Sequence, residues 1–392
     1  MKGHIRPARV ADRNVFDVII HLGRDENGKY RYTSKRVHGN KKAAQAECSR
    51  MLHELSTGAF VEPSKSTVAQ FMTSWLEHAK TKVARRSYDR YEQIVRDHIT
   101  QSLGHHALTS LRPLHVQSAL SAWLQSGRVD GKGGLSSQTV RHHYAVLREA
   151  LGCAVRWGIL VRNVCDAVEP PKARDVEVVP PTAEAVATLL ESVKGTRLEG
   201  PVWLAALTGL RRGEILGLAW SSVDLEAGVL TVRRTLQQSA DGQLYFKEPK
   251  SASSRRRMEL SPMSVDLLRR QKAAQNEDRL KLGPGYKGEL VFAQADGSPW
   301  KPDNFSSAFP QFLERNGLPH IRFHDLRHSF ATALARSGVH PRVAQQLLGH
   351  SDPRLTMKVY SHSAPDLERS AMTCVGDALQ AALTKNARSQ RS

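Results

Sequence analysis

The start of the chain alternates between strand-like and helix-like hydrophobic patterns. Residues 15–22 are rich in apolar and β-branched side chains, and the Asn27-Gly28 pair that follows is a hairpin turn signal. Residues 29–37 then alternate aromatic and basic side chains, which is typical of a second strand. Residues 41–55 repeat apolar side chains at helical spacing. We therefore predict a small ββα module.

The central part of the chain carries helical patterns only. Apolar side chains repeat at helical spacing over residues 68–76, 88–99, 116–124 and 140–155. We expect the aromatic side chains of these repeats to lie in a core and the basic side chains between them to face outward. The pattern predicts an all-helical domain.

The last part of the chain mixes both patterns. Thr182 is placed to cap a helix, with Glu184 in its first turn. The run 229–238 has strand character, a turn follows at 240–243, and strands return before helices resume after Ser261. These patterns predict an α+β domain.

Two turn-rich stretches divide the patterns into domains. Residues 56–66 and 170–181 contain Pro together with charged and small residues, and Pro blocks the continuation of a helix. We expect residues 1–60 to form the first domain, residues 66–170 the helical domain, and residues 175–392 the last domain with a tail helix. The predicted fold class is multidomain, mainly α with small β-sheets.

The composition indicates what kind of partner the protein binds. The 392 residues carry 57 Lys and Arg against 38 Asp and Glu, a formal net charge of +19, and hydrophobic residues make up 40%. That hydrophobic share excludes a disordered chain. The excess positive charge is spread over all three predicted domains, so every part would be attracted to a polyanion. DNA is the expected partner, because each phosphate that Lys or Arg neutralises releases counterions.

The sequence also predicts where the protein works. No run approaches the roughly 18 apolar residues of a membrane span, and the first residues lack the apolar stretch of a secretory signal. The four cysteines lie far apart without CxxC spacing, which disfavours disulfides and fits a reducing cytosol. We expect no membrane association and a cytoplasmic location.

Four segments of the last domain carry the candidate chemistry. They are ALTGLRRGEILGLAW (206–220), EPKSASSRRRMEL (248–260), FHDLRHSFATALARSGV (323–339) and LLGHSDPRLTMKVYSH (347–362). Together they resemble the motifs of the tyrosine recombinases, the phage integrase family. The N-terminal ββα module resembles the arm-type DNA-binding domain of integrases from mobile elements. The resemblance assigns a catalytic set of six residues: Arg211, Lys250, His324, Arg327, His350 and Tyr360.

The resemblance implies a site-specific DNA recombinase of a phage or another integrative element. It implies an arm-binding domain, a helical core-binding domain and a catalytic domain that cuts and rejoins DNA through a 3′-phosphotyrosine intermediate. Neither a metal, ATP nor another cofactor is implied. The implied partners are double-stranded attachment-site DNA, a tetramer of the same chain on that DNA, and accessory DNA-bending and directionality factors.

The residue types in these motifs also suit phosphoryl transfer in their own right. His324 and Arg327 are three residues apart on one predicted helix and share a face. Two arginines can hold the non-bridging oxygens of a phosphodiester and neutralise the charge of its transition state. The phenol of Tyr360 has a reference pKa of about 10, is easier to ionise beside such cations, and can form a covalent intermediate. Lys250 can protonate the departing 5′-oxygen.

A zinc site is an alternative use of the same histidines. His324 and His328 are four residues apart, which is also a zinc-ligand spacing, with His350 or His362 as a third ligand. Neither an HExxH glutamate nor a Cys pair accompanies them, which favours the metal-free interpretation.

Two catalytic assignments have a neighbour that competes for the role. Arg211 and Arg212 are adjacent, and the resemblance favours Arg211, with Glu214 as a buttress of the site. Lys247 lies three residues before Lys250, and the register of the predicted hairpin leaves both open.

Basic side chains outside the catalytic motifs are candidate DNA contacts. We expect the N-terminal strand with Arg31, Thr33 and Lys35 to enter a DNA groove at a site distinct from the crossover site. In the helical domain, basic side chains are expected to meet phosphates. The candidates are Arg31, Thr33, Lys35, Lys82, Arg85, Arg86 and Arg141.

The tail carries an apolar stripe at helical spacing, formed by Val375, Ala378, Leu379, Ala382 and Leu383. Such a stripe needs a surface that covers it. It can pack on its own catalytic domain or, as the resemblance implies, on a neighbouring protomer, and the sequence leaves both arrangements open.

Two other functions compete with recombination. A type IB topoisomerase, which relaxes DNA, would use the same chemistry, but the N-terminal module and the compact catalytic segment argue against it. A non-catalytic DNA-binding regulator would keep the fold, and the complete catalytic set argues against that function.

Overall fold

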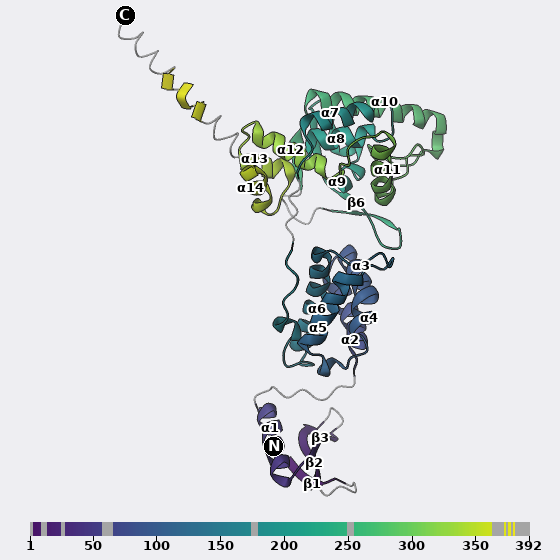
Figure 1. Ribbon diagram of the computed structural model, residues 1–392. Coiled ribbons are helices and arrows are strands. Elements are labelled where there is room, and N and C mark those ends of the chain that lie inside the picture. The colour runs from purple at the N-terminus through teal and green to yellow at the C-terminus, as the bar shows by residue number, and fades with distance from the viewer. Residues whose placement is uncertain are drawn as a thin grey trace, which may run out of the picture. The chain divides into compact units, whose positions relative to one another are not determined.

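The computed structural model describes most of the chain: residues 3–8, 14–24, 28–56, 66–173, 179–248, 255–362, 372–373, 375–377 and 379–380. The chain divides into two compact units, residues 1–176 and 177–392 (Figure 1). It is mainly helical with small antiparallel sheets, as predicted. Within the described ranges, each helix falls short of the length or the apolar character that crossing a bilayer requires.

A three-stranded antiparallel sheet opens the first unit, and a helix covers one of its faces. The sheet consists of β1 (Gly3–Pro7), β2 (Val15–Arg24) and β3 (Tyr30–His38), in that order, and the helix is α1 (Lys41–Ser56). The sequence analysis did not predict β1. Ile5 is the only large aliphatic side chain in it, so the strand carries little hydrophobic pattern. Gly3 lets β1 approach α1 closely, since a Cβ there would lie 2.6 Å from the Cys48 sulfur.

The side of β3 that was expected to face DNA is the side of α1. Residues directly opposite one another in an antiparallel pair share a face, and Thr33 and Lys35 lie opposite buried core residues of β2. Lys35 also forms a 2.7 Å ion pair with Glu47 of α1. By strand alternation, Arg31 points to the same side. These three side chains therefore lie on the side of β3 that α1 covers, and their contact with DNA stays a prediction.

The open face of the sheet carries aromatic and basic side chains instead. Tyr30 and Tyr32 are 61% and 65% exposed, and their ring centroids lie 6.5 and 6.4 Å from that of His21. The Arg24 guanidinium lies 4.4 Å over the Tyr30 ring. Arg36 shares this face by alternation along β3.

A separate helical core makes up the rest of the first unit. It contains α2 (Val68–Lys82), α3 (Arg85–Ile94), a π-helical turn (Val95–Ile99), α4 (Thr100–Leu103), α5 (Pro113–Ser126) and α6 (Ser137–Arg156), with 3-10 turns at Leu108–Ser110 and Val164–Ala167. Thr67 and Gln70 form a reciprocal capping box that begins α2. Trp75, Leu120 and Leu147 lie in the core. The four predicted helical repeats are confirmed.

The second unit surrounds a larger core with helices and two small sheets. Its elements are α7 (Ala183–Ser192), α8 (Glu199–Thr208), α9 (Arg212–Leu216), β4 (Val223–Asp224), β5 (Val229–Val232), β6 (Thr235–Gln238), β7 (Leu244–Lys247), β8 (Arg256–Glu259), α10 (Pro262–Leu282), α11 (Pro302–Arg315), α12 (Asp325–Arg336), α13 (Pro341–Leu348) and α14 (Pro353–His362), with 3-10 turns at Trp220–Ser222 and Gly283–Gly285. α12 packs against α8, and α12, α13 and α14 contact one another (Figure 1).

The run 229–238 is two strands in two sheets, where the sequence predicted one. β5 pairs with β4 and β8, whereas β6 pairs with β7. Between them, the side chain of Arg234 donates from Nε to the Gly217 carbonyl at 3.1 Å. This side-chain bond holds the chain where it passes from one sheet to the other.

Candidate active site

A tight turn between α8 and α9 presents Arg211. α8 ends at Thr208, and Gly209 follows with a φ of 64°, a left-handed conformation that favours glycine. Arg211 donates to the Glu214 carboxylate from its backbone N–H at 2.9 Å and from Nη1 at 2.8 Å. Its Nη2 donates to the Gly349 carbonyl at 2.9 Å. The side chain is 39% exposed, so it reaches both the interior and solvent.

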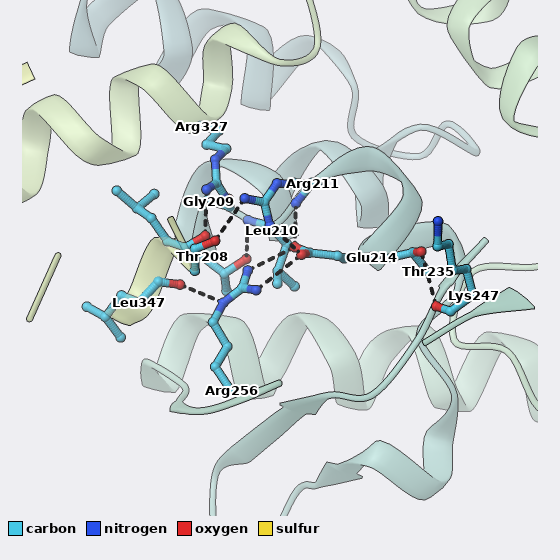
Figure 2. Close-up of polar contacts among 12 residues, drawn as sticks. Thr208, Gly209, Leu210, Arg211, Glu214, Thr235, Lys247, Arg256, Arg327 and Leu347 are labelled. Atoms are coloured by element: carbon cyan, nitrogen blue, oxygen red, sulfur yellow. Dashed lines mark hydrogen bonds and ion pairs between the residues drawn. The ribbon is translucent and has the colours of Figure 1, made fainter. Parts of the chain in front are cut away.

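The Glu214 carboxylate is the centre of this cluster. It is buried, and Arg256 of β8 donates to its two oxygens from Nη1 at 3.1 Å and Nη2 at 2.8 Å. Figure 2 shows Glu214 with Arg211 and Arg256 converging on it. Burial raises the pKa of Glu214, but the hydrogen bonds and charge of Arg256, with the charge of Arg211, outweigh it and hold that pKa below its ordinary value. The carboxylate is therefore ionised at neutral pH.

Arg327 of α12 completes a group of three arginines. Its buried side chain donates from Nη1 to the Gly209 carbonyl at 2.7 Å and from Nη2 to the Leu348 carbonyl at 2.5 Å. Burial, followed by the positive charge of Arg211, lowers the pKa of Arg327 to about 9, so the guanidinium stays protonated at neutral pH. Two guanidinium groups thus bind the Glu214 carboxylate and a third lies within its electrostatic reach, and the net positive charge suits an oxyanion.

Two histidines border the arginines as neutral groups. His324 lies just before α12, and His350 follows the left-handed turn that ends α13. Desolvation by the surrounding protein, together with nearby imidazole and guanidinium groups, lowers the pKa of each to about 4. Nδ1 of His350 lies 2.9 Å from Oγ1 of Thr356, which orients the ring. Both imidazoles are neutral at pH 7 and can accept a proton.

Tyr360 lies on α14 and packs against α12 and α13. Its ring is buried and packs with Ala335 and Ala344. Its hydroxyl donates to the Val339 carbonyl at 2.6 Å. Burial raises the pKa of Tyr360, and no described guanidinium counters that rise. Tyr360 lies two turns into α14, and the hydrogen bond of its hydroxyl goes to a backbone carbonyl rather than to an arginine.

The two adjacent arginines of the TGLRR segment have different surroundings. Arg211 enters the cluster around Glu214. Arg212 turns to α11, where Nη1 donates to the Pro302 carbonyl at 3.0 Å and also bonds the Ser306 hydroxyl. This geometry supports Arg211 as the member of the site.

The predicted hairpin lysine, Lys250, lies outside the described residues. Its competitor Lys247 is the last residue of β7 and is half-buried. The Thr235 hydroxyl donates to the Lys247 carbonyl at 3.2 Å, which anchors this end of the hairpin (Figure 2). The role of Lys250 stays a prediction.

The histidines of the zinc alternative meet edge to face. The ring centroids of His324 and His328 lie 5.1 Å apart. Among the residues that the structure describes, no three His, Cys, Asp or Glu side chains converge in a way that could hold a metal ion. The side chain of His362 lies outside the described part.

Sequence reasoning missed two residues of this site. Arg256 had a detectable signal, because it lies two residues before the buried Met258 and so shares the inward face of β8. Thr356 is buried beside His350, one turn before Tyr360 on α14. A lone threonine inside a helix carries no comparable signal.

The other predicted DNA contacts lie in the helical domain. Lys82, Arg85 and Arg86 are exposed where α2 ends and α3 begins, and they form one basic corner. Arg141 of α6 is also exposed and donates to the Pro171 carbonyl at 3.2 Å. Their contact with DNA stays a prediction.

Two family descriptions match the chain. The phage integrase family matches residues 182–366, a range that includes the arginine cluster and Tyr360. The N-terminal SAM-like domain of phage integrases matches residues 67–124, within the helical domain.

Proteins of similar sequence are named as recombinases and integrases. A tyrosine recombinase XerC-like protein of Caldanaerobacter subterraneus subsp. tengcongensis is 28% identical over 93% of this chain and 96% of its own length. The ICEBs1 integrase of Bacillus subtilis is 30% identical over 63% of this chain and 67% of its own length.

Solved structures share the fold. The Tn1549 transposon integrase, in complex with a circular intermediate DNA, matches with a TM-score of 0.66 and 22% identity, over 79% of this chain and 99% of that chain. A lambda integrase tetramer bound to a Holliday junction matches with a TM-score of 0.55 and 18% identity, over 91% of this chain and 94% of that chain.

Gly349 makes the arginine cluster sensitive to one added carbon. It has a φ of 63°, and a Cβ there would lie 2.7 Å from Nη1 of Arg256. Gly317 has a φ of 62° with open space around it. We expect Gly317→Ala to lower the free energy of unfolding by about 1–2 kcal/mol, the cost of a left-handed alanine. Gly349→Ala should cost about 1–3 kcal/mol more, because Arg256 must move.

Denaturant titration of the two variants beside the wild-type chain measures this difference. Equal losses at the two glycines would contradict the close packing of Gly349 on Arg256.

Proposed function

The chain belongs to the phage integrase family of tyrosine recombinases, and from that membership we propose how its residues cut and rejoin DNA. It is an enzyme of site-specific DNA recombination. We propose that it integrates and excises a phage or another integrative element through a 3′-phosphotyrosine intermediate. The observation that carries the proposal is the group of Arg211, Arg256 and Arg327 around the single carboxylate of Glu214.

The scissile phosphodiester completes the charge balance of this cluster. A guanidinium has five N–H donors, and Arg211 and Arg327 each direct two of theirs into the protein. Donors that remain would bind the non-bridging oxygens and neutralise the charge that grows in the transition state. The guanidinium groups thereby supply the positive charge that a metal ion supplies in many nucleases.

Tyr360 is the nucleophile once it leaves the Val339 carbonyl. Its Oη attacks the phosphorus, the bond to the 5′-oxygen breaks, and a 3′-phosphotyrosine forms. The phenol proton passes to a neutral imidazole, His324 or His350, and the 5′-oxygen takes a proton from Lys250. Rejoining reverses these steps with a 5′-hydroxyl from another strand, so the energy of the broken bond is kept and ATP is not needed.

In its docked position the hydroxyl of Tyr360 is engaged by the Val339 carbonyl. There the phenol is buried and its pKa is raised, so the hydroxyl stays protonated and hydrogen-bonded. A shift of α14 toward the arginines would bring the phenol into a positive field, which favours its ionised form. DNA that draws α14 to the phosphate would couple binding to activation.

The three predicted domains divide the DNA contacts. Residues 66–170, with the basic corner of Lys82, Arg85 and Arg86, and the catalytic domain (175–392) would clamp the crossover site of double-stranded attachment DNA. Residues 1–60 would bind a second, arm-type site through the open face of the N-terminal sheet. Aromatic and basic side chains on that face suit contact with base edges and phosphates. Such an enzyme acts on the chromosome, in the cytoplasm of a bacterial host.

Recombination of two duplexes requires four strand cuts, and we infer a tetramer of this chain on DNA. The lambda integrase tetramer on a Holliday junction supports this state. In the described part of the tail, Val375 and Leu379 are 58% and 61% exposed, so a neighbouring protomer could cover them. Accessory DNA-bending and directionality factors would act on this assembly.

The central test removes one oxygen atom. Tyr360→Phe should leave folding and DNA binding intact, because the ring still fills its site. It should abolish the covalent adduct on a nicked core-site duplex taken from the DNA that flanks the gene. Denaturing gel electrophoresis detects the adduct, and mass photometry of the Phe variant should still find complexes of four protomers.

Adduct formed by the Phe variant would show that Tyr360 is not the nucleophile. Ending the same variant after Ala364 is the matched control for assembly. The shortened chain should bind single core sites and lose the four-protomer complex, and an unchanged complex would show that the tail packs on its own domain.

The two faces of the N-terminal sheet predict different effects for two neighbouring residues of β3. Tyr32→Ala removes an exposed ring from the open face and should weaken binding to full-length attachment DNA about 5- to 30-fold, as expected for a lost base or backbone contact of about 1–2 kcal/mol. Thr33→Ala, on the helix side, should change it less than about twofold. Fluorescence anisotropy measures both, and neither variant should alter cleavage of a short core site. A larger loss of binding for Thr33→Ala than for Tyr32→Ala would show that the helix side of the sheet binds DNA.

A further inference from the structure

The C-terminal end of α13 holds three arginines with three consecutive carbonyls. Along residues 347–349, the successive carbonyls accept hydrogen bonds from Arg256 at 2.7 Å, Arg327 at 2.5 Å and Arg211 at 2.9 Å. The last carbonyls of a helix lack partners within the helix and form the negative end of its dipole. This helix end is therefore a favourable seat for guanidinium groups, and His350 follows it directly.

Arg256 differs from the other two arginines because all three of its guanidinium nitrogens are engaged inside the protein. Nε donates to the Leu347 carbonyl, and Nη1 and Nη2 donate to Glu214. Its side chain is 6% exposed. Arg256 is thus placed to hold protein groups, whereas Arg211 is exposed enough to reach a ligand.

Arg256 limits how Arg211 can use Glu214. A carboxylate offers about four acceptor positions on its two oxygens. Here two are taken by Arg256 and two by the backbone N–H and Nη1 of Arg211. With those positions filled, Arg211 keeps Nη2 for Gly349 and has the N–H of Nε and the second N–H of each terminal nitrogen left for a ligand. Without Arg256, the guanidinium of Arg211 could form a bidentate pair of hydrogen bonds with the Glu214 carboxylate. That pairing would turn the guanidinium away from a phosphate.

We propose that Arg256 is a positioning residue for strand cleavage, which by occupying Glu214 and binding the end of α13 keeps Arg211 directed at the scissile phosphate and His350 beside it. This inference rests on the proposed function. Arg256 acts through Arg211 and the end of α13 and does not itself contact DNA.

The test compares cleavage with binding in the full-length chain. On a nicked core-site duplex with saturating protein, Arg256→Met should slow single-turnover adduct formation on the order of 100-fold, as for the loss of one transition-state donor. The Kd for the same duplex should change less than about threefold, because many other cations hold the phosphates. Adding Glu214→Gln should make adduct formation at least about tenfold faster than in Arg256→Met alone, because a neutral amide binds Arg211 less tightly than a carboxylate.

Two further variants keep this test interpretable. Arg257→Met alters the next residue, which lies on the exposed side of β8, and should cleave at the wild-type rate. Arg256→Lys keeps the buried charge and most of the volume but lacks the planar fork. Arg256→Lys replaces the Met variant if that variant does not unfold cooperatively. Its adduct formation should also be slow, and adding Glu214→Gln should also raise its rate.

A double variant that folds but cleaves no faster than the single variant would overturn the inference, since a purely structural residue is not rescued by removing its partner's charge. Slow cleavage by Arg257→Met would overturn it as well. A wild-type chain that forms no adduct in the same assay would instead overturn the proposed function, so the two failures are distinguishable.

Discussion

The shared carboxylate of Glu214 is the interaction on which the rest of the site depends. A buried carboxylate is stable only when charged partners satisfy it. Here those partners are Arg211, from the turn before α9, and Arg256 of β8. The same two arginines and Arg327 hold the end of α13. Charged hydrogen bonds thereby fix segments that are far apart in the sequence, on top of an apolar core. The arrangement leaves excess positive charge, so the network that gives the site its rigidity also suits the binding of a phosphate that we propose.

The reacting groups of the site are in two different states. Backbone carbonyls and Glu214 hold the arginines in place, and the two histidines are neutral. The phenol of Tyr360 is docked elsewhere, on the Val339 carbonyl. On the proposed mechanism, the charged part is preorganised, which avoids reorganisation during the reaction. Only the nucleophile moves, and its arrival then depends on α14.

The sequence predicted the parts of this structure that depend on local patterns. Helical periodicity identified the four repeats of the first unit. The resemblance to tyrosine recombinases pointed to Arg211, Arg327 and His350, which the structure brings together at the end of α13. Contacts across long stretches of sequence could not be predicted, as with Arg256 and the carbonyls of residues 347–349. Strand alternation showed that β3 has two faces but not which one α1 covers. A lysine usually marks a solvent-facing side, but Lys35 lies on the helix side and pairs with Glu47 of α1. β1 escaped detection because Ile5 alone carries its apolar signal. No local pattern could show that the hydroxyl of Tyr360 is bonded to Val339.

The most direct test of the account is cleavage in EDTA by variants of the two arginines that we propose bind the scissile phosphate. Single-turnover adduct formation on a nicked core-site duplex is measured for the wild-type chain, Arg211→Ala and Arg327→Ala, with binding of the same duplex measured in parallel. The account predicts that the wild-type chain cleaves in EDTA and that each variant loses on the order of 10²–10³ in rate, while binding changes far less. Wild-type cleavage that stops when metal is removed, or variants that cleave at the wild-type rate, would contradict a clamp made of guanidinium groups.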